Sequence, residues 1–387
     1  MTFPPTHYDF IKIQHPVVIE CAEADALDLL SQPAPPETIG SVDHYESRAE
    51  QCLNTTLEMY NRRGPYPDTV MKSLITSLNY EYHCVVNFAL SGKKTFYFSN
   101  DLCEQLAHTE INLPADQLQL PFPSCMFVYT SETVLRCFHN TIGAEGRRNI
   151  NLNKVDMTAP ITVFLTSRPG PDNERKLVTV SFHSRTPDRA YAMLKREMSL
   201  SRANDLEQAL RTDWGKSNPP GGEGTIKSID LNRDTISQTI DDKMFYTDGL
   251  MFYRILLNSV LYLTSETKEV SHHETSRAAY IERANRETRA AKRRKILQFS
   301  NKFSELAYSL VGESVGKIIV SKAGQSNQEP KSSPSGSKHI GKRFIVRGHW
   351  RNQAYGQGML LKRLIWIRPY FKGPDVAALI NKPYLVK

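Results

Sequence analysis

A long polar stretch near the C-terminus divides this chain into two parts. Residues 323–338 read Ala-Gly-Gln-Ser-Asn-Gln-Glu-Pro-Lys-Ser-Ser-Pro-Ser-Gly-Ser-Lys. Such a composition supplies no large apolar side chains for a core. We therefore expect a flexible linker over 323–342, between a globular body, 1–322, and a C-terminal module, 343–387. With 387 residues, 40% of them hydrophobic, the chain has enough apolar material for a substantial core.

The charges are distributed unevenly on the two sides of this stretch. Residues 331–387 contain twelve Lys and Arg and one acid, Asp375, a balance of +11. The whole chain has 49 basic and 41 acidic residues. Residues 1–330 therefore contain 37 basic and 40 acidic residues, a balance of −3. A concentrated field of one sign favours a polyanionic partner more than a diffuse one does.

The body is predicted to be α+β, with an antiparallel sheet flanked by helices. Apolar runs bounded by turn residues predict strands, and helical spacing or N-cap residues predict helices. The predicted strands are 94–99, 125–129, 161–165 and 177–182. The predicted helices are 43–63, 100–108, one beginning at Thr186, 250–263 and a long basic helix over about 276–310.

The C-terminal module is predicted to be a small basic β-hairpin. Residues 343–347 and 360–367 alternate enough to be strands, with Tyr355-Gly356-Gln357-Gly358 near their connection. Cations alternate with aromatic rings along this segment. Guanidinium groups pair with phosphate oxygens, while rings offer faces on which unpaired bases stack. The candidate nucleic-acid-binding residues of the module are Arg347, His349, Trp350, Arg351, Tyr355, Lys362, Arg363, Trp366, Arg368 and Tyr370.

A second interpretation of the two tryptophans is compatible with the first. Trp350 and Trp366 would form a small core that pins the hairpin to the body, and the cations would be its solvated face. Both interpretations can hold together.

A second basic run lies upstream, in the predicted long helix. Residues 277–295 contain eight Lys and Arg against Glu282 and Glu287, and end in Lys292, Arg293, Arg294 and Lys295. Either this is a solvated helix laced with ion pairs, or it follows a nucleic-acid backbone. We include the four terminal cations among the candidate nucleic-acid-binding residues.

Catalysis is an alternative that rests on one histidine. His349 lies between Arg347 and Arg351, so it could act as a general base beside a bound phosphate, which would make the protein a ribonuclease. A single histidine is more often structural, so a non-enzymatic protein is the leading expectation. The six dispersed cysteines show no zinc spacing, and no phosphate-loop pattern occurs, so we expect no metal and no cofactor.

The sequence predicts a cytoplasmic protein with no membrane partner. The longest apolar stretch, 249–264, carries Arg254 and Asn258 and is shorter than the roughly 20 residues that span a bilayer. The N-terminus lacks the basic start and apolar run of a secretory signal.

Three C-terminal motifs carry a family resemblance. Arg347-Gly348-His349-Trp350, Tyr355-Gly356-Gln357-Gly358 and Trp366-Ile367-Arg368-Pro369 resemble those of a phage- and plasmid-borne family that includes a type V-A anti-CRISPR protein. The resemblance implies a mobile-element protein in a bacterial host that suppresses a host effector nuclease through its nascent chain and message. Its implied partners are RNA or the ribosome, and a host protein or nascent polypeptide. A DNA-handling replication accessory protein remains a further alternative.

Overall fold

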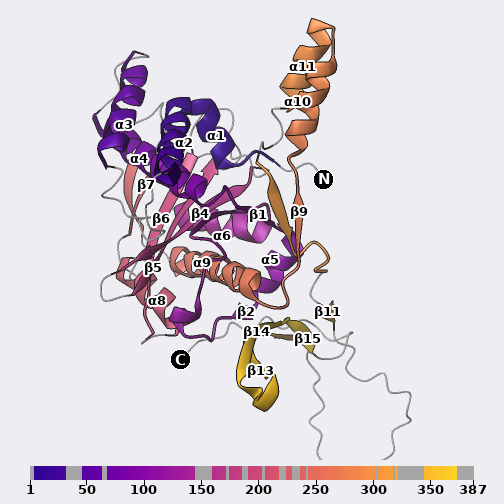
Figure 1. Cartoon of the computed structure of the whole chain (residues 1–387). Helices are drawn as coiled ribbons and strands as arrows, with labels where there is room; N and C mark the ends of the chain where they lie inside the picture. Colours follow the sequence, from indigo (N-terminus) through magenta and orange to yellow (C-terminus); the bar gives the residue numbers. More distant parts are fainter. Residues whose placement is uncertain are drawn as a thin grey trace, which may run out of the picture.

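The centre of the computed structural model is a sheet with helices on both faces (Figure 1). The structure describes residues 4–31, 46–62, 68–143, 159–170, 174–184, 191–202, 205–217, 224–228, 236–240, 243–300, 304, 306–316, 319–320 and 344–372. The predicted α+β class is confirmed. The predicted linker, 323–342, lies outside the described residues.

The main sheet has seven strands in the order β6-β5-β4-β3-β1-β10-β9. From β3 to β6 it is an antiparallel meander, whereas β1 pairs in parallel with both of its neighbours. All four predicted strands lie in this sheet. The strands are β1 Thr95–Phe98, β3 Ser124–Tyr129, β4 Ile161–Pro169, β5 Arg175–Ser184, β6 Tyr191–Leu200, β9 Val270–His273 and β10 Tyr308–Val311.

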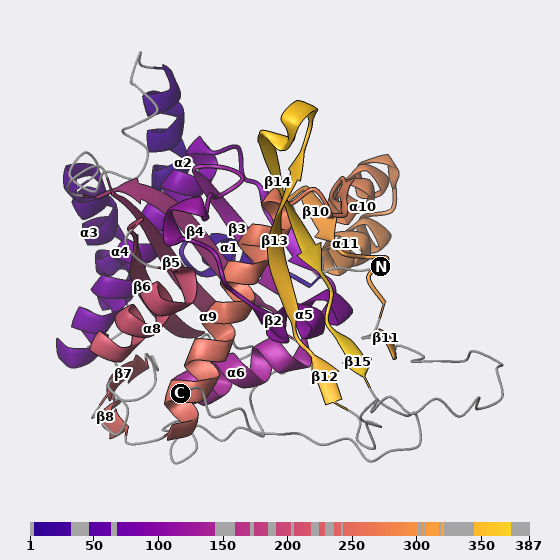
Figure 2. The ribbon, with the colours of Figure 1, turned by 90° about the horizontal axis from the view of Figure 1, so that it is seen from below.

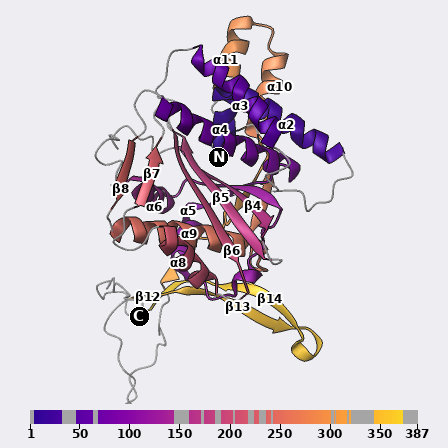
Figure 3. The same cartoon turned by 90° about the vertical axis from the view of Figure 1, so that its left-hand side faces the viewer.

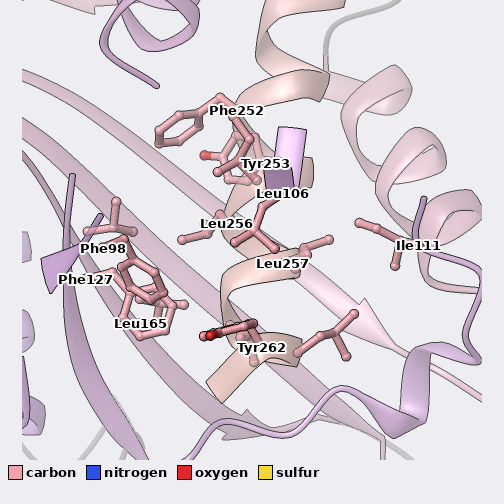
Figure 4. Close-up of a cluster of buried hydrophobic side chains, with 14 of the residues drawn as sticks. Phe98, Leu106, Ile111, Phe127, Leu165, Phe252, Tyr253, Leu256, Leu257 and Tyr262 are labelled. Carbon is pink, nitrogen blue, oxygen red and sulfur yellow. The ribbon is translucent and has the colours of Figure 1, made fainter. Parts of the chain in front are cut away.

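Two hydrophobic cores cover the two faces of this sheet. Alternate side chains of a strand point to opposite faces, so Phe96 and Phe98 join one core and Tyr97 joins the other. Figure 4 shows the first core, where α9 packs on the strands. Its helices are α5 Asn100–Ala107, α6 Glu132–Gly143, α8 Leu206–Ser217 and α9 Lys243–Thr264. The opposite face carries α1 His7–Gln14, α2 Pro16–Ser31, α3 Glu46–Asn61 and α4 Asp68–Leu90.

The prediction of a helix that begins at Thr186 is wrong for residues 191–200, the part of this segment that the structure describes. Residues 191–200 form β6, which pairs with β5 along its whole length. Met198 and Leu200 are buried in the sheet's core. The strand partner and this burial outweigh the helix propensity of the Met, Leu, Lys, Arg and Glu residues in the segment.

The prediction of a single basic helix over about 276–310 is also wrong. The chain forms two helices that pack against each other, α10 Ser276–Arg286 and α11 Ala290–Ser300, and then enters the sheet as β10. The first helix ends at Glu287, whose backbone is extended (φ −85°, ψ 123°). The Glu287 carboxylate accepts a hydrogen bond from the backbone N–H of Arg289 at 3.1 Å and pairs with Lys292 at 2.9 Å. These contacts fix the turn between the two helices. We call the pair of helices the helical arm (276–300), and it projects from the body (Figure 1).

Three smaller sheets complete the described residues. Their orders are β11-β15-β12, β14-β13-β2 and β7-β8. The strands of these three sheets are β2 Thr109–Glu110, β7 Gly224–Ser228, β8 Ile236–Ile240, β11 Ile319–Val320, β12 Phe344–Val346, β13 Gly348–Tyr355, β14 Leu361–Ile367 and β15 Tyr370–Lys372.

No helix of the described ranges is both long enough and apolar enough to span a bilayer.

Candidate nucleic-acid interface

The predicted C-terminal hairpin is present, but its first strand differs from the prediction. β13 pairs with β14 from His349 opposite Ile367 to Tyr355 opposite Leu361. The predicted strand at 343–347 corresponds to β12, which pairs with β15 instead. The start of β13 also pairs in parallel with β2 of the body. Figure 2 shows this β13–β14 hairpin crossing the end of the body and projecting beyond it.

The hairpin has a body side and a solvent side, because side chains alternate along each strand. Trp350 and its cross-strand partner Trp366 point into the core. His349, Arg351, Tyr355 and Arg363 have the opposite parity and are exposed. We call these four residues the hairpin face.

The two tryptophans anchor the hairpin to the body. Their side chains are almost completely buried, at 3% and 5% exposure. Trp350 Nε1 donates to Asn258 Oδ1 of α9 at 2.8 Å, and Trp366 Nε1 donates to Thr109 Oγ1 at 3.1 Å. The Asn258 amide in turn donates to the carbonyl oxygens of Leu106 and Thr109. The two indoles are therefore not available for base stacking, because no nucleotide can reach their faces in this conformation.

Gly348 allows the hairpin to approach the body closely. Its backbone N–H donates to the His108 carbonyl oxygen at 2.9 Å. A Cβ atom at this position would lie 2.7 Å from Thr109 Oγ1 and 2.9 Å from the Ile367 carbonyl oxygen. The glycine of the Arg-Gly-His-Trp motif is thus required by packing.

Gly348→Ala is expected to lower the free energy of unfolding by about 1–3 kcal/mol, because the added methyl group overpacks a backbone contact. Urea denaturation measures this difference. Gly316→Ala is the matched control, since nothing lies within 4 Å of the added Cβ there. Equal stabilities of the two variants would contradict the packing role.

The cations of the hairpin differ in how far the body neutralises them. Arg347 pairs with Glu110 of β2, with 3.1 Å between Nη1 and Oε1. Within the described part of the chain, no salt bridge is formed by the other four candidate cations, Arg351, Lys362, Arg363 and Arg368. Residues 344–372 contain no Asp or Glu at all. The hairpin therefore keeps an uncompensated positive field.

The remaining exposed rings lie beside these cations. The Arg363 guanidinium carbon is 5.2 Å from the centre of the Tyr355 ring. Tyr355 is 41% exposed and Tyr370, on β15, is 37% exposed. Bases can therefore reach the rings of Tyr355 on the hairpin and of Tyr370 on β15, whereas the two tryptophan rings are buried.

His349 is exposed on the hairpin face. Its cross-strand partners are Ile367 on β14 and Glu110 on β2. Arg351 shares its side of the strand. The ribonuclease alternative stays a prediction, and the described residues contain no cluster of three or more His, Cys, Asp or Glu suited to a metal ion.

The model of the AcrVA2-like family, described as "Anti-CRISPR type V subtype A2 family", matches residues 96–372, from β1 to the end of β15. This chain belongs to the AcrVA2-like family. Membership indicates an anti-CRISPR function.

The crystal structure of AcrVA2 matches 93% of this chain and 95% of its own chain, with 13% sequence identity and a TM-score of 0.37. The sequence matches no curated protein.

The second basic surface of this AcrVA2-like protein lies far from the hairpin. The helical arm and the β13–β14 hairpin project from opposite ends of the body (Figures 1 and 3). On α11, Lys292 pairs with Glu287, which agrees with the interpretation of a solvated, ion-paired helix. Arg293, Arg294 and Lys295 are exposed and form no salt bridge with a described carboxylate. The sequence candidates therefore form two separate basic surfaces.

Sequence reasoning missed the tip of the hairpin. Met359, Leu360 and Leu361 are 70%, 86% and 55% exposed. An apolar run next to a strand is usually a sign of burial, so no sequence pattern predicted that these side chains lie in solvent.

Proposed function

We propose that this AcrVA2-like protein exerts its anti-CRISPR function by binding RNA or the ribosome through the β13–β14 hairpin. Its body would hold the protein target, a host protein or a nascent polypeptide, so that expression of a host effector is suppressed. The observation that carries the RNA-binding part is the acid-free hairpin, where Arg351, Lys362, Arg363 and Arg368 are exposed without a carboxylate partner among the described residues.

Phosphate binding is what this surface is chemically suited for. Guanidinium groups donate paired hydrogen bonds to phosphate oxygens. Tyr355 presents a ring beside Arg363, which gives an unpaired base a stacking surface next to a phosphate contact. Tyr370 adds a second exposed ring near the base of the hairpin.

The salt dependence of RNA binding tests the proposal. Filter binding of a single-stranded RNA should give a log affinity that falls linearly with log salt concentration. Replacing Arg351, Lys362, Arg363 and Arg368 with Gln removes four phosphate contacts. We expect the slope to become shallower by about 3 and the affinity to fall about tenfold or more, because each contact contributes about 0.7 to the slope.

A control with the same change in net charge shows whether the location of the cations matters. Lys12, Arg62, Arg136 and Arg202 are four exposed cations of the body, and their Gln variant should retain the wild-type slope. Equal losses of RNA affinity in the two variants, or unchanged RNA affinity in the hairpin variant, would reject the hairpin as the RNA site.

Two other outcomes would support the alternative functions. RNA that is cleaved by the wild-type protein and stays intact with His349→Ala would support the ribonuclease alternative. Preference for duplex DNA in competition would support a DNA-handling protein.

A further inference from the structure

The tip of the β13–β14 hairpin exposes apolar side chains in the middle of a cationic surface. Met359 and Leu360 have most of their surface in solvent, and Leu361 more than half. Lys362 and Arg363 follow directly in the chain. Contiguous exposed apolar groups on a protein surface commonly mark a binding site.

The tip is a preformed turn. Gly356, Gly358 and Met359 all have positive φ, at 80°, 64° and 55°, and the Met359 backbone N–H donates to the Gly356 carbonyl oxygen at 3.1 Å. A positive φ is unfavourable for a residue with a side chain such as methionine. Strained backbone of this kind is concentrated at functional sites. Met359 and Leu360 therefore lie in the turn that joins β13 to β14, and Figure 2 shows this turn at the free end of the hairpin.

The placement of the cations distinguishes between two polyanionic partners, a membrane and a nucleic acid. A strand rises about 3.3 Å per residue, so Arg351 lies roughly 13 Å behind Tyr355 along β13, and Arg368 lies roughly 23 Å behind Leu361. An apolar tip enters a membrane interface by only about 5–10 Å. With a screening length of about 8 Å, the cations at the base of the hairpin would contribute little to membrane binding. A nucleic acid that lies along the hairpin face reaches Arg351 near its base as well as Arg363 near its tip.

We propose that Met359 and Leu360 form a wedge that inserts between the bases of RNA at an internal loop or bulge, while the hairpin cations hold the flanking phosphates. Apolar side chains of this size unstack base steps in other nucleic-acid complexes. Unstacking costs least where bases are not paired, and RNA-binding proteins select such sites. This inference rests on the proposed RNA binding by the same hairpin and specifies its substrate class as duplex RNA interrupted by unpaired bases.

Two RNA duplexes of equal length and equal phosphate number test the wedge, one fully paired and one with a two-by-two mismatched internal loop that contains 2-aminopurine. We expect wild-type protein to bind the mismatched duplex about tenfold more tightly and to raise the 2-aminopurine fluorescence several-fold. The Met359→Ser/Leu360→Ser variant should bind both duplexes equally and leave the fluorescence unchanged. Leu360→Phe, which keeps a large apolar group at the tip, should retain the preference.

A matched apolar control is available on α2, where Leu27 and Leu30 are 69% and 59% exposed. Leu27→Ser/Leu30→Ser should behave as wild type. Equal binding of the two duplexes by wild-type protein would overturn the wedge while leaving RNA binding by the hairpin intact. Absence of binding to either RNA at low salt would overturn both proposals. Wild-type binding to anionic phosphatidylserine vesicles, lost in the tip variant and unaccompanied by the mismatch preference, would assign the tip to a membrane instead.

Discussion

Trp350→Ala is expected to lower the free energy of unfolding by about 3–5 kcal/mol. The substitution removes an indole that is 3% exposed and packs beside Trp366, with 6.2 Å between the ring centroids. It also removes the donor to Asn258 Oδ1, and Asn258 is completely buried. An acceptor left without a donor in the core adds its desolvation cost to the cost of the cavity. Urea denaturation followed by circular dichroism measures the effect.

Two further variants divide this loss into its causes. Trp350→Phe keeps a ring but removes the N–H donor, so we expect about 1–3 kcal/mol from the unsatisfied Asn258 oxygen. Tyr355→Ala, on the solvent side of the same strand, should cost less than about 1 kcal/mol. If Trp350→Ala and Tyr355→Ala proved equally stable, the hairpin would not be anchored to the core through its tryptophan.

The anchoring could not be predicted from the sequence, although the hairpin's charge could. Counting Lys and Arg is enough to locate the basic field, because charge does not depend on the fold. Which rings stay exposed depends on partners that are remote in the chain. Asn258 is 92 residues from Trp350, and Thr109 is 257 residues from Trp366. The choice between stacking rings and anchoring rings therefore required the tertiary structure.

The strands differ in how clearly the sequence marks them. The segment Cys125–Tyr129 is a continuous apolar run, and it is buried on both faces in the centre of the sheet. β13 reads Gly-His-Trp-Arg-Asn-Gln-Ala-Tyr, with a single large apolar residue on its body side. No alternation marks this segment as a strand, and it is held in place by β14 and β2. β6 carries strong helix formers and becomes a strand because β5 pairs with it.

Glu81→Leu is expected to destabilise the protein by about 3–5 kcal/mol, because the carboxylate is fully buried between two histidines. Glu81 lies on α4. Its Oε2 is 2.6 Å from His15 Nδ1, and its Oε1 is 3.2 Å from Nε2 of His7. The His7 ring stacks on Phe182 of β5, with 3.8 Å between the ring centroids. The cluster therefore ties α1 and the start of α2 to α4 and the sheet, and the variant removes the Glu81 carboxylate from beside two buried imidazoles.

The same cluster makes stability depend on pH in a defined direction. Burial alone would raise the pKa of Glu81, but the charge of His15 and hydrogen bonds from His15 and His7 outweigh it and lower the pKa from 4.5 to about 2. Burial lowers the pKa of His7 below 6.5, and this outweighs its hydrogen bond with Glu81. Both groups bind protons more readily in the unfolded chain. Their stabilisation is complete above about pH 6.5 and is lost as pH falls, first through His7 and then, below about pH 4.5, through Glu81.

Urea denaturation from pH 7.5 to pH 3.5 tests both statements together. The wild-type free energy of unfolding should decrease on acidification, and Glu81→Leu should show a lower value at pH 7.5 with a shallower decrease below pH 4.5, because the variant has no carboxylate to protonate. Glu58→Leu is the control, since Glu58 is exposed on α3 and its loss should change stability by less than about 0.5 kcal/mol. A Glu81→Leu variant as stable as wild type at pH 7.5 would mean that α1 is held by packing around Phe182, with no net contribution from the buried carboxylate.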